Sequence, residues 1–249
     1  MKISIITINR NNAAGLGRTL RSIARQLKTL SPERTIEHIV VDGQSTDQSL
    51  HQLLPELNSQ VIIAPPKGIY NAINLGIKQS TGDIIGLLHS GDAYIDDDIL
   101  QTLAEHFETN PGDDFVWGDI IIGLRQYGAA NFSPRKLTIG FAPPHPSLYL
   151  RRHVIDRIGL YNETYTTAAD FEYFVRLFTY RSFTGSYLPL TMVKMQPGGT
   201  SQKFLNRLWL NNTERLRALS RHGLPANRLR LLAYYPIVLK GFICSSKKK

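Results

Sequence analysis

The sequence predicts an α/β protein whose central sheet is mostly parallel and carries helices on both faces. Apolar runs of strand length, rich in β-branched residues, alternate with segments in which apolar residues recur at helical spacing. The alternation occurs four times over the first hundred residues, as in folds that connect parallel strands through helices. The length of 249 residues favours one core with an appended segment over two full domains.

The first unit joins a strand to a helix. The run "ISIITI" at residues 3–8 is continuous and β-branched, which is typical of a strand buried on both faces of a parallel sheet. A polar loop follows, and then Leu16, Leu20, Ile23 and Leu27 recur at helical spacing. These residues predict the first strand and the first helix.

The second unit begins with another buried strand, "IEHIVVD", at residues 36–42. A polar stretch follows Asp42, and either Ser45 or Thr46 is suited to cap a helix there. We expect that helix to extend to Leu57.

The remaining elements complete the predicted fold. The run "QVIIA" predicts a third strand at residues 60–64, a helical pattern covers residues 69–79, and "GDIIGLLHSGD" contains the fourth strand. Beyond residue 115 the regular alternation gives way to mixed structure. The expected elements there are a strand in "FVWGDIII", a proline-punctuated loop entering a strand in "PPHPSLYL", and a helix in "AADFEYFVRLF".

Polar side chains follow four of the predicted strands at the point where each strand ends. Asn9 and Arg10 follow the first strand, and Asp42 ends the second. Lys67 follows the third strand, and residues 89–92 follow the fourth. Because ligands bind outside the carboxyl ends of strands in such sheets, we expect these residues to converge on one crevice.

The net charge of +9 is concentrated near the end of the chain. Residues 200–249 contain eleven Lys and Arg against one acidic residue, Glu214, whereas the preceding residues contain eighteen against nineteen. A near-neutral body with a basic segment indicates a docking surface, whereas a uniformly basic protein would suggest nucleic acid. We therefore expect a body of residues 1–201 followed by a basic, amphipathic and mainly helical segment, 202–249.

This basic segment also contains apolar runs. The stretch "RLRLLAYYPIVLKGFIC", residues 228–244, is too short to span a membrane and is interrupted by Pro236 and Lys240. Interleaved basic, aromatic and aliphatic residues fit a segment that lies on an anionic membrane surface. A helix packed on the core with its charged face in water is an equal alternative.

Two observations concern the cellular compartment. The single cysteine, Cys244, excludes an internal disulfide framework and a zinc site made of several cysteines. The stretch "MKISIITINR" has a strand pattern and lacks the long apolar region of a signal peptide. We therefore expect a protein of the reducing cytosol.

Glycine-rich phosphate loops give no strong signal. The stretch "GLGRTL" has two glycines at the spacing of a dinucleotide-binding loop but lacks the third, and no Walker-type Gly-Lys-Ser/Thr occurs. A Rossmann dehydrogenase and a P-loop enzyme are therefore disfavoured.

Taken together, the strand ends resemble those of the inverting glycosyltransferases of family 2, which have a GT-A fold. The resemblance covers residues 1–201 and implies a nucleotide-binding half, 1–110, and an acceptor half, 111–201. Within the family, the chain is most similar to bacterial exopolysaccharide and O-antigen enzymes, such as colanic acid transferases. Five stretches carry the resemblance: "SIITINRNN", "IVVDGQSTDQS", "KGIYNAINLGIKQSTGDIIGLLHSGD", "RRHVIDRIGLYNETYTTAADFEYFVRL" and "PGGTS".

The resemblance implies roles for three carboxylates. Asp42 would contact the nucleobase, Asp92 would bind Mg²⁺ or Mn²⁺ beside the diphosphate, and Asp170 would be the general base. Ser90 occupies the first acidic position of the metal motif, which leaves one carboxylate there. Asp170 could instead only cap a helix, and Glu172 is then the reserve candidate for the base.

Further residues match family positions that face the donor, the acceptor or the diphosphate. Each of them could also have a local structural role, such as capping or forming a turn. The donor-side residues are Thr7, Asn9, Arg10, Lys67, Asn71, Asn74, Ser90 and Gly91, and those of the acceptor or diphosphate loops are His145, Gly198, Gly199 and Thr200.

The resemblance therefore implies an enzyme that moves a sugar from a nucleoside diphosphate, with uridine favoured, to a lipid-linked saccharide in bacterial surface polysaccharide synthesis. It would work at the cytoplasmic face of the membrane, held on anionic lipid by the basic segment. The alternative is a non-catalytic, membrane-associated partner that kept the fold, which the serine at position 90 favours. We expect no nucleic-acid partner, because the basic segment contains no recognisable reading motif.

Overall fold

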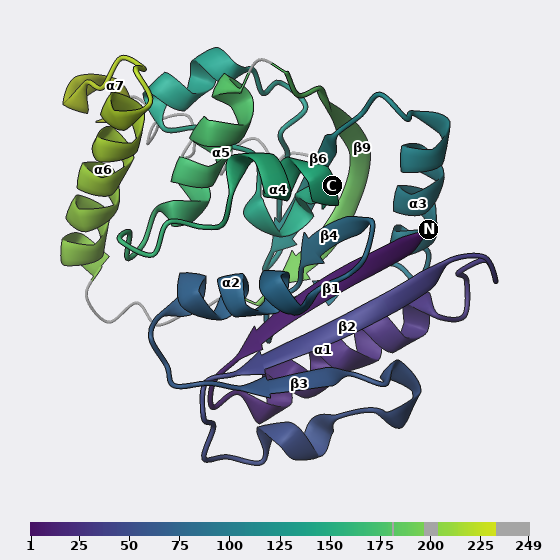
Figure 1. Cartoon of the computed structure of the whole chain (residues 1–249). Helices are drawn as coiled ribbons and strands as arrows, with labels where there is room; N and C mark the ends of the chain where they lie inside the picture. Colours follow the sequence, from purple (N-terminus) through teal and green to yellow (C-terminus); the bar gives the residue numbers. More distant parts are fainter. Residues whose placement is uncertain (181, 197–203, 233–249) are drawn as a thin grey trace.

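The computed structural model describes residues 1–180, 182–196 and 204–232 of the chain (Figure 1). These residues form a nine-stranded sheet with helices on both faces. The strand order is β3-β2-β1-β4-β8-β6-β9-β5, and β7 pairs with β6 outside this path.

The half of the sheet made by the first ninety residues is parallel. Its strands are β1 (Lys2–Asn9), β2 (Thr35–Asp42), β3 (Gln60–Ile63) and β4 (Ile84–Leu87). Asn9 is paired with Asp42 in the register of β1 and β2, so these two strands end at the same level. Their polar end residues therefore lie side by side.

The other half of the sheet is mixed. It contains β5 (Ala93–Tyr94), β6 (Phe115–Ile122), β7 (Arg125–Tyr127), β8 (Tyr149–Arg151) and β9 (Gly185–Met195). β8 is antiparallel to both β4 and β6 and so joins the two halves. β9 runs parallel to β6 and antiparallel to β5.

Helices cover the two faces of the sheet unequally. One face packs against α1 (Ala13–Gln26) and α3 (Ile99–Thr109), and the other packs against α2 (Ile69–Gln79), α4 (Arg152–Ile158) and α5 (Ala169–Thr179). Two hydrophobic cores result, a first core on the side of α1 and α3 and a second core on the side of α2, α4 and α5. Neighbouring side chains of β1 point to opposite faces, so Ile5 lies in the first core and Ile6 in the second. Both are fully buried, and each contributes about 1.5–3 kcal/mol through the removal of apolar surface from water.

The expected helix between Thr46 and Leu57 is wrong. Two short 3₁₀ turns, Ser49–Gln52 and Pro55–Leu57, lie there instead. Leu54 is extended, with ψ of 123°, because a proline disfavours helical backbone in the residue before it. Ser45 does not cap a helix, since its main-chain N–H and its hydroxyl both donate to the carboxylate of Asp42.

Two helices lie in the described part of the basic segment. α6 (Phe204–Arg221) packs beside α5, and α7 (Arg228–Leu232) packs on the 3₁₀ turn Pro134–Ile139 (Figure 1). Within residues 1–180, 182–196 and 204–232, no helix has the length and apolar character required to cross a bilayer. The second core includes Ala218 and Leu219, so α6 contributes apolar contacts to the body of the protein.

Candidate functional site

A cavity of about 500 Å³ opens at the carboxyl ends of β1, β2 and β4, beside the amino-terminal end of α2. An apolar wall with a few polar groups is typical of a site for a small molecule. Its polar lining includes Asn9, Arg10, Asn71, His89 and Ser90, and its apolar wall includes Ile8, Val41, Ile69, Ala72 and Leu75.

Asp42 supports this cavity from behind its lining. Its carboxylate is almost fully buried and accepts hydrogen bonds from Asn9 Nδ2 at 2.8 Å, from Ser45 Oγ at 2.7 Å and from Ser45 N at 2.7 Å. Its neighbours Val41 and Gly43 line the cavity. Asp42 therefore orients the amide of Asn9, whose Oδ1 is buried and has no hydrogen-bond partner among the described residues.

The β3–α2 loop forms another edge of the cavity. Pro66 and Gly68 line it, whereas Lys67 between them has an exposed side chain that is not part of the lining. Gly68 precedes α2 with a φ of 108°, a conformation that glycine adopts without strain. The loop can therefore turn sharply into the helix that carries Asn71.

The turn of Ser90, Gly91 and Asp92 is held by α1. The hydroxyl of Thr19 donates to Asp92 O at 2.6 Å and accepts from Gly91 N at 3.0 Å. Gly91 has a φ of 107°, and a Cβ added there would lie 3.2 Å from Gln196 Oε1. The turn therefore requires glycine at this position.

The Asp92 side chain is buried, and among the described residues no charged group pairs with it. Its exposed fraction is 6%, and the Gln196 main chain donates a hydrogen bond to its carboxylate. Burial raises the pKa of Asp92 to about 7, because a low dielectric disfavours the charged form. A cation beside the carboxylate would offset this cost.

The neighbourhood of Asp92 fits a hard cation that takes most of its ligands from elsewhere. Among the described residues, no group of three or more His, Cys, Asp and Glu side chains is arranged to hold a metal ion. Mg²⁺ commonly binds to one or two carboxylates and completes its shell with substrate phosphates and water. A single buried carboxylate at the end of a strand is compatible with that mode of binding.

The acidic run after this turn serves the protein structure. Asp97 forms an ion pair with Arg25 at 2.5 Å, and Asp98 precedes α3 without a side-chain capping bond. Gln26 provides the cap instead, since its Oε1 accepts from Leu100 N at 3.0 Å and its Nε2 donates to Asp96 O. Acidic residues favour the amino terminus of a helix, but here a glutamine of α1 provides the side-chain cap of α3.

Asp170 lies in the first turn of α5. Its Oδ1 accepts from its neighbour Phe171 N at 2.8 Å and from Tyr70 Oη at 3.4 Å. Glu172 is unsuited to be a base, because its buried carboxylate pairs with Arg176 at 2.9 Å and with His222 at 2.9 Å. The structure therefore leaves Asp170 as the candidate of the two.

His145 belongs to a buried aromatic group behind Asp170. Its Nε2 lies 2.8 Å from Tyr161 Oη, and the Tyr161 ring stacks on Tyr173 at 4.2 Å. Burial lowers the pKa of His145, and the charge of Asp170 opposes this shift. The His89 ring lies 6.3 Å from the His145 ring and has a pKa lowered to about 3 by burial, so it is neutral near pH 7.

Besides Asp42, Lys67 and Gly91, two more residues expected on the donor side do not line the cavity, Thr7 and Asn74. Thr7 is fully buried and its hydroxyl lies 3.0 Å from His38 Nε2. Asn74 is also buried and connects α2 to the loop after α4, through hydrogen bonds with both main-chain groups of Tyr161 and with Glu163. Both side chains are therefore committed to the fold.

The expected acceptor or diphosphate loop of Gly198, Gly199 and Thr200 lies outside the described residues, so the structure tests no role for these three. Sequence reasoning missed three residues that complete the site: Tyr70, Gln196 and Glu214. Each contacts a residue far away in the sequence, and a local pattern carries no signal for such contacts.

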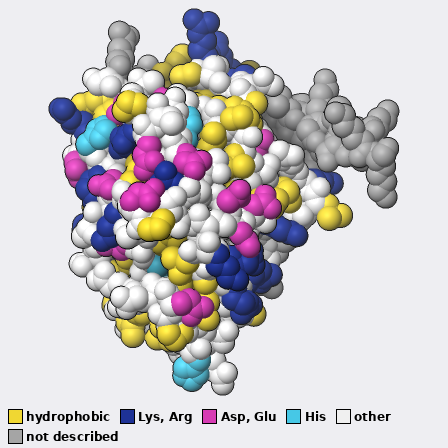
Figure 2. Space-filling view, turned by 90° about the vertical axis from the view of Figure 1, so that its right-hand side faces the viewer, with side chains coloured by type: hydrophobic (Ala, Val, Ile, Leu, Met, Phe, Trp, Pro, Cys, Tyr) yellow, Lys and Arg dark blue, Asp and Glu magenta, His cyan; other side chains and the backbone are white. Residues whose placement is uncertain are grey.

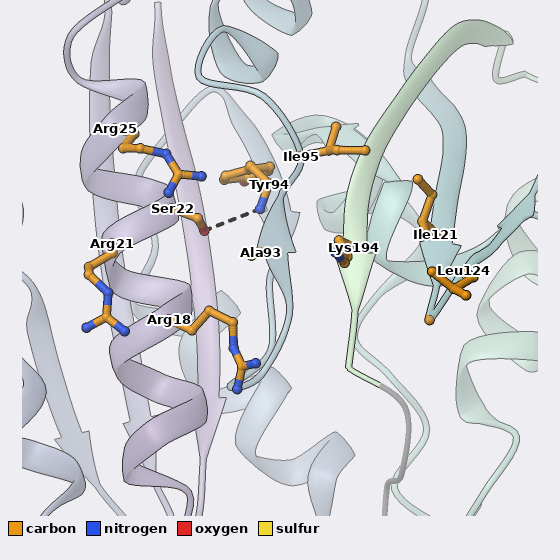
Figure 3. A pocket seen from close by; sticks show the side chains of 11 residues that line it. Arg18, Arg21, Ser22, Arg25, Ala93, Tyr94, Ile95, Ile121, Leu124 and Lys194 are labelled. Atoms are coloured by element: carbon orange, nitrogen blue, oxygen red, sulfur yellow. Dashed lines mark hydrogen bonds between the residues drawn. The ribbon is translucent and has the colours of Figure 1, made fainter.

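A second cavity, of about 530 Å³, lies between α1, β5 and the end of β9 (Figure 3). Figure 2 shows Lys and Arg side chains gathered on one part of the molecular surface, close to acidic ones. In the cavity, however, Arg25 pairs with Asp97, Arg18 donates to Gln196 Oε1, and Arg21 points away from β5. No expected site residue lines this cavity.

Comparison with known proteins gives consistent results. The model of the family described as "Glycosyl transferase family 2" matches residues 4–172. An uncharacterized glycosyltransferase of Mycobacterium tuberculosis is 32% identical over 185 residues, which are 70% of this chain and 68% of the relative. A PGL/p-HBAD biosynthesis glycosyltransferase of Mycobacterium bovis is 29% identical over 215 residues, 83% of this chain and 82% of the relative.

Solved structures share the fold. S. aureus TarS 1-349 in complex with UDP-GlcNAc has a TM-score of 0.70 at 17% identity, and the match covers 88% of this chain and 66% of that one. The chain spans only 43% of the longer TarS structure. The mannosyltransferase PcManGT of Pyrobaculum calidifontis, in complex with GDP-Man and Mn²⁺, has a TM-score of 0.64 at 15% identity. The match covers 88% of this chain and 63% of that one. The expected GT-A fold is thereby confirmed.

Proposed function

The chain belongs to glycosyl transferase family 2, and we propose that it transfers a sugar, with inversion, from a nucleoside diphosphate to an acceptor hydroxyl. The observation that carries this proposal is the cavity at the strand ends, which has Asp92 beside one edge and Asp170 linked to the helix α2 that lines it. In this proposal the cavity would bind the nucleotide, and the two carboxylates would lie on opposite sides of the reacting sugar.

UDP is the favoured nucleotide. The unpartnered Oδ1 of Asn9 could accept a hydrogen bond from a base N–H, and the apolar wall could pack against the base. Solved complexes of TarS with UDP and UDP-GlcNAc support a uridine donor, whereas the PcManGT complex with GDP-Man makes guanosine the alternative.

Asp92 would hold Mg²⁺ or Mn²⁺. The cation would neutralise negative charge that develops on the departing diphosphate. Ser90 and Gly91 keep the turn small, so that a diphosphate can approach Asp92 closely. The Mn²⁺ in the PcManGT complex supports a divalent cation in this fold.

Asp170 would deprotonate the acceptor hydroxyl as it attacks the sugar. A general base must lie within hydrogen-bond reach of the proton that it removes, on the side opposite the leaving group. Tyr70 keeps its proton, because burial and the charge of Asp170 raise its pKa well above the ordinary range. It therefore donates to Asp170 and holds the carboxylate in place.

We propose a lipid-linked saccharide as the acceptor, in the synthesis of bacterial surface glycans. The similarity to a PGL/p-HBAD biosynthesis enzyme supports a surface glycolipid. The protein would work at the cytoplasmic side of the membrane, with the basic segment on anionic lipid, since residues 200–249 contain eleven basic residues and one acidic residue.

The proposal is tested by thermal shift with UDP, GDP and their sugars, each with and without Mn²⁺ or Mg²⁺. A ligand that binds the native state raises Tm by mass action, so a metal-dependent shift identifies nucleotide and cation together. Asp170→Asn should then abolish nucleotide release from the matching sugar donor while it preserves the shift. Turnover that survives this substitution would assign the base elsewhere.

One observation favours a second candidate function. Ser90 replaces the first acid of the metal motif, as expected of a partner that kept the fold and lost catalysis. A folded protein that shows no shift with any nucleotide would support this second function over the first.

A further inference from the structure

Glu214 of α6 reaches across to the loop that carries Asp170. Its Oε1 accepts from Thr166 N at 2.7 Å. Its Oε2 accepts from Thr167 N at 2.8 Å, from Thr167 Oγ1 at 2.9 Å and from Ala168 N at 2.9 Å. One carboxylate therefore takes four hydrogen bonds from three consecutive residues, and the last of these lies two positions before Asp170.

We propose that Glu214 is a positioning residue for the general base, an inference that rests on the proposed function. It acts through the loop and does not touch the reacting atoms. The side chains of Ala168 and Ala169, at the start of α5, offer no oxygen that could fix the backbone. The carboxylate of α6 provides that fixation from 46 residues away.

The charge of Glu214 is needed for this arrangement. The side chain is 6% exposed, and burial alone would raise its pKa. The main-chain N–H groups of the loop and the Thr167 hydroxyl outweigh burial and hold the pKa below its usual value. Hydrogen bonds to an ionised acceptor are roughly twice as strong as those between neutral groups, so this contact is stiff.

Neighbouring residues of α6 contact the same loop. Asn211 Nδ2 donates to Thr167 O at 3.4 Å, and Arg217 Nη2 donates to Thr164 O at 2.9 Å. Asn211, Glu214 and Arg217 are spaced three residues apart and so share a face of the helix. The guanidinium of Arg217 also lies 3.9 Å from the centre of the Tyr165 ring. α6 is therefore built to hold residues 164–168.

The hydrogen bonds between Glu214 and residues 166–168 should affect catalysis more than donor binding. Among the described residues, the hydrogen bond that joins Asp170 to the donor side comes from Tyr70, at 3.4 Å, whereas α5 does not line the cavity itself. A displacement of a reacting group by about 1 Å can cost roughly 100-fold in rate. Loosening the loop should therefore lower kcat and leave the donor KM nearly unchanged.

The test uses the full-length protein with Glu214→Gln, in which an amide group faces N–H donors, and Glu214→Asp, which keeps the charge on a shorter side chain. Glu56→Gln, at an exposed position of a 3₁₀ turn, is the matched control. Asn211→Ala is a milder change to the same loop if Glu214→Gln does not fold. Hydrogen–deuterium exchange of residues 166–168 is measured beside Tm, the UDP-induced shift, kcat and KM.

We expect Glu214→Gln to exchange faster at residues 166–168 and to lose roughly 10- to 100-fold in kcat, with the UDP-induced shift retained. Glu214→Asp should lie between this variant and the wild type, and Glu56→Gln should match the wild type. Unchanged exchange, or a kcat within about twofold of the wild type, would overturn the inference alone. A wild type that neither binds nor turns over any nucleotide sugar would overturn the proposed function and this inference with it.

Discussion

The hydroxyl of Tyr70 lies 3.4 Å from a carboxylate oxygen of Asp170, and this contact joins the first turn of α2 to the first turn of α5. The two helices belong to different halves of the chain. α2 lines the cavity at the strand ends, and α5 carries the candidate base. The relative position of the cavity and the candidate base therefore depends on this pair.

Tyr70→Phe is predicted to lower kcat by about 5- to 10-fold, because one hydrogen bond is worth about 1 kcal/mol. The aromatic ring and its stacking on Tyr161 at 6.1 Å are kept, so Tm should change little. Steady-state kinetics with the donor found by thermal shift measure the effect. Tyr127→Phe, on the distant strand β7, serves as the control. An unchanged kcat in Tyr70→Phe would show that the Tyr70 hydroxyl does not contribute to catalysis.

Asp92→Asn is predicted to abolish the metal-dependent part of the nucleotide shift. The substitution keeps the shape of the side chain and removes the charge that a cation needs. Without metal, the Tm of the variant should equal or exceed that of the wild type at pH 8, since a buried charge is removed. A variant that retains its response to Mn²⁺ would place the cation elsewhere.

Gly91→Ala is predicted to destabilise the protein by about 1–3 kcal/mol, since alanine is strained at a φ of 107°. The added Cβ would also lie 3.2 Å from Gln196 Oε1 and disturb the turn that carries Asp92. Gly112→Ala is the matched control, because its Cβ would meet nothing within 4 Å. Urea unfolding compares the two, and equal stabilities would contradict the assigned strain.

Alanine substitutions of Asn71 and Asn74 are predicted to have different effects, although the two residues lie one helical turn apart. Asn74→Ala leaves both main-chain groups of Tyr161 without their partner and should cost about 2–4 kcal/mol of stability. Asn71→Ala, at the cavity, should instead raise the donor KM with little change in Tm. Urea unfolding and steady-state kinetics on both variants measure these effects. A loss of stability in Asn71→Ala and a raised donor KM in Asn74→Ala would contradict the prediction.

The contribution of His38 to stability is predicted to fall as the pH drops from about 6.5 to about 4. Burial lowers the pKa of His38 to about 4, so between these values the unfolded chain binds the proton and the folded protein does not. The contribution of His38 to stability therefore rises with pH across this window, by about 3 kcal/mol in total, and opposes the contribution of Asp92, whose raised pKa acts in the other direction. His38→Gln should flatten the profile, whereas the exposed His51→Gln should not. Urea unfolding at several pH values measures both.

The sequence was sufficient to predict six strands of the body, β1 to β4, β6 and β8, and the helices α1, α2 and α5, but not β5, β7 or β9. The continuous β-branched runs that became β1 and β2 are typical of buried parallel strands and have few alternatives. The prediction failed between Thr46 and Leu57, where the proline at position 55 outweighed a weak helical pattern. In that region, local backbone restriction decided the outcome.

Only those features of the candidate site that depend on the order of strands and helices, or on family motifs, could be predicted from the sequence. Strand ends indicated the turn that carries Asp92, because a parallel sheet brings such points together, whereas Asp170 was indicated by the resemblance to the family. The rotation of α2 about its axis is decided by packing, so the sequence could not tell that Asn74 is buried. Contacts such as that between Glu214 and Ala168 join elements that the pattern does not relate.

The place of β9 in the sheet has a consequence for assembly during translation. β9 lies between β6 and β5, and Ala93 of β5 pairs with Lys194. The parallel strands β1 to β4 all lie before residue 88, so they can associate before β9 is translated. The turn beside Asp92 must wait for a strand that is translated much later. The nascent chain therefore forms the crevice at its strand ends first and completes the surroundings of Asp92 last.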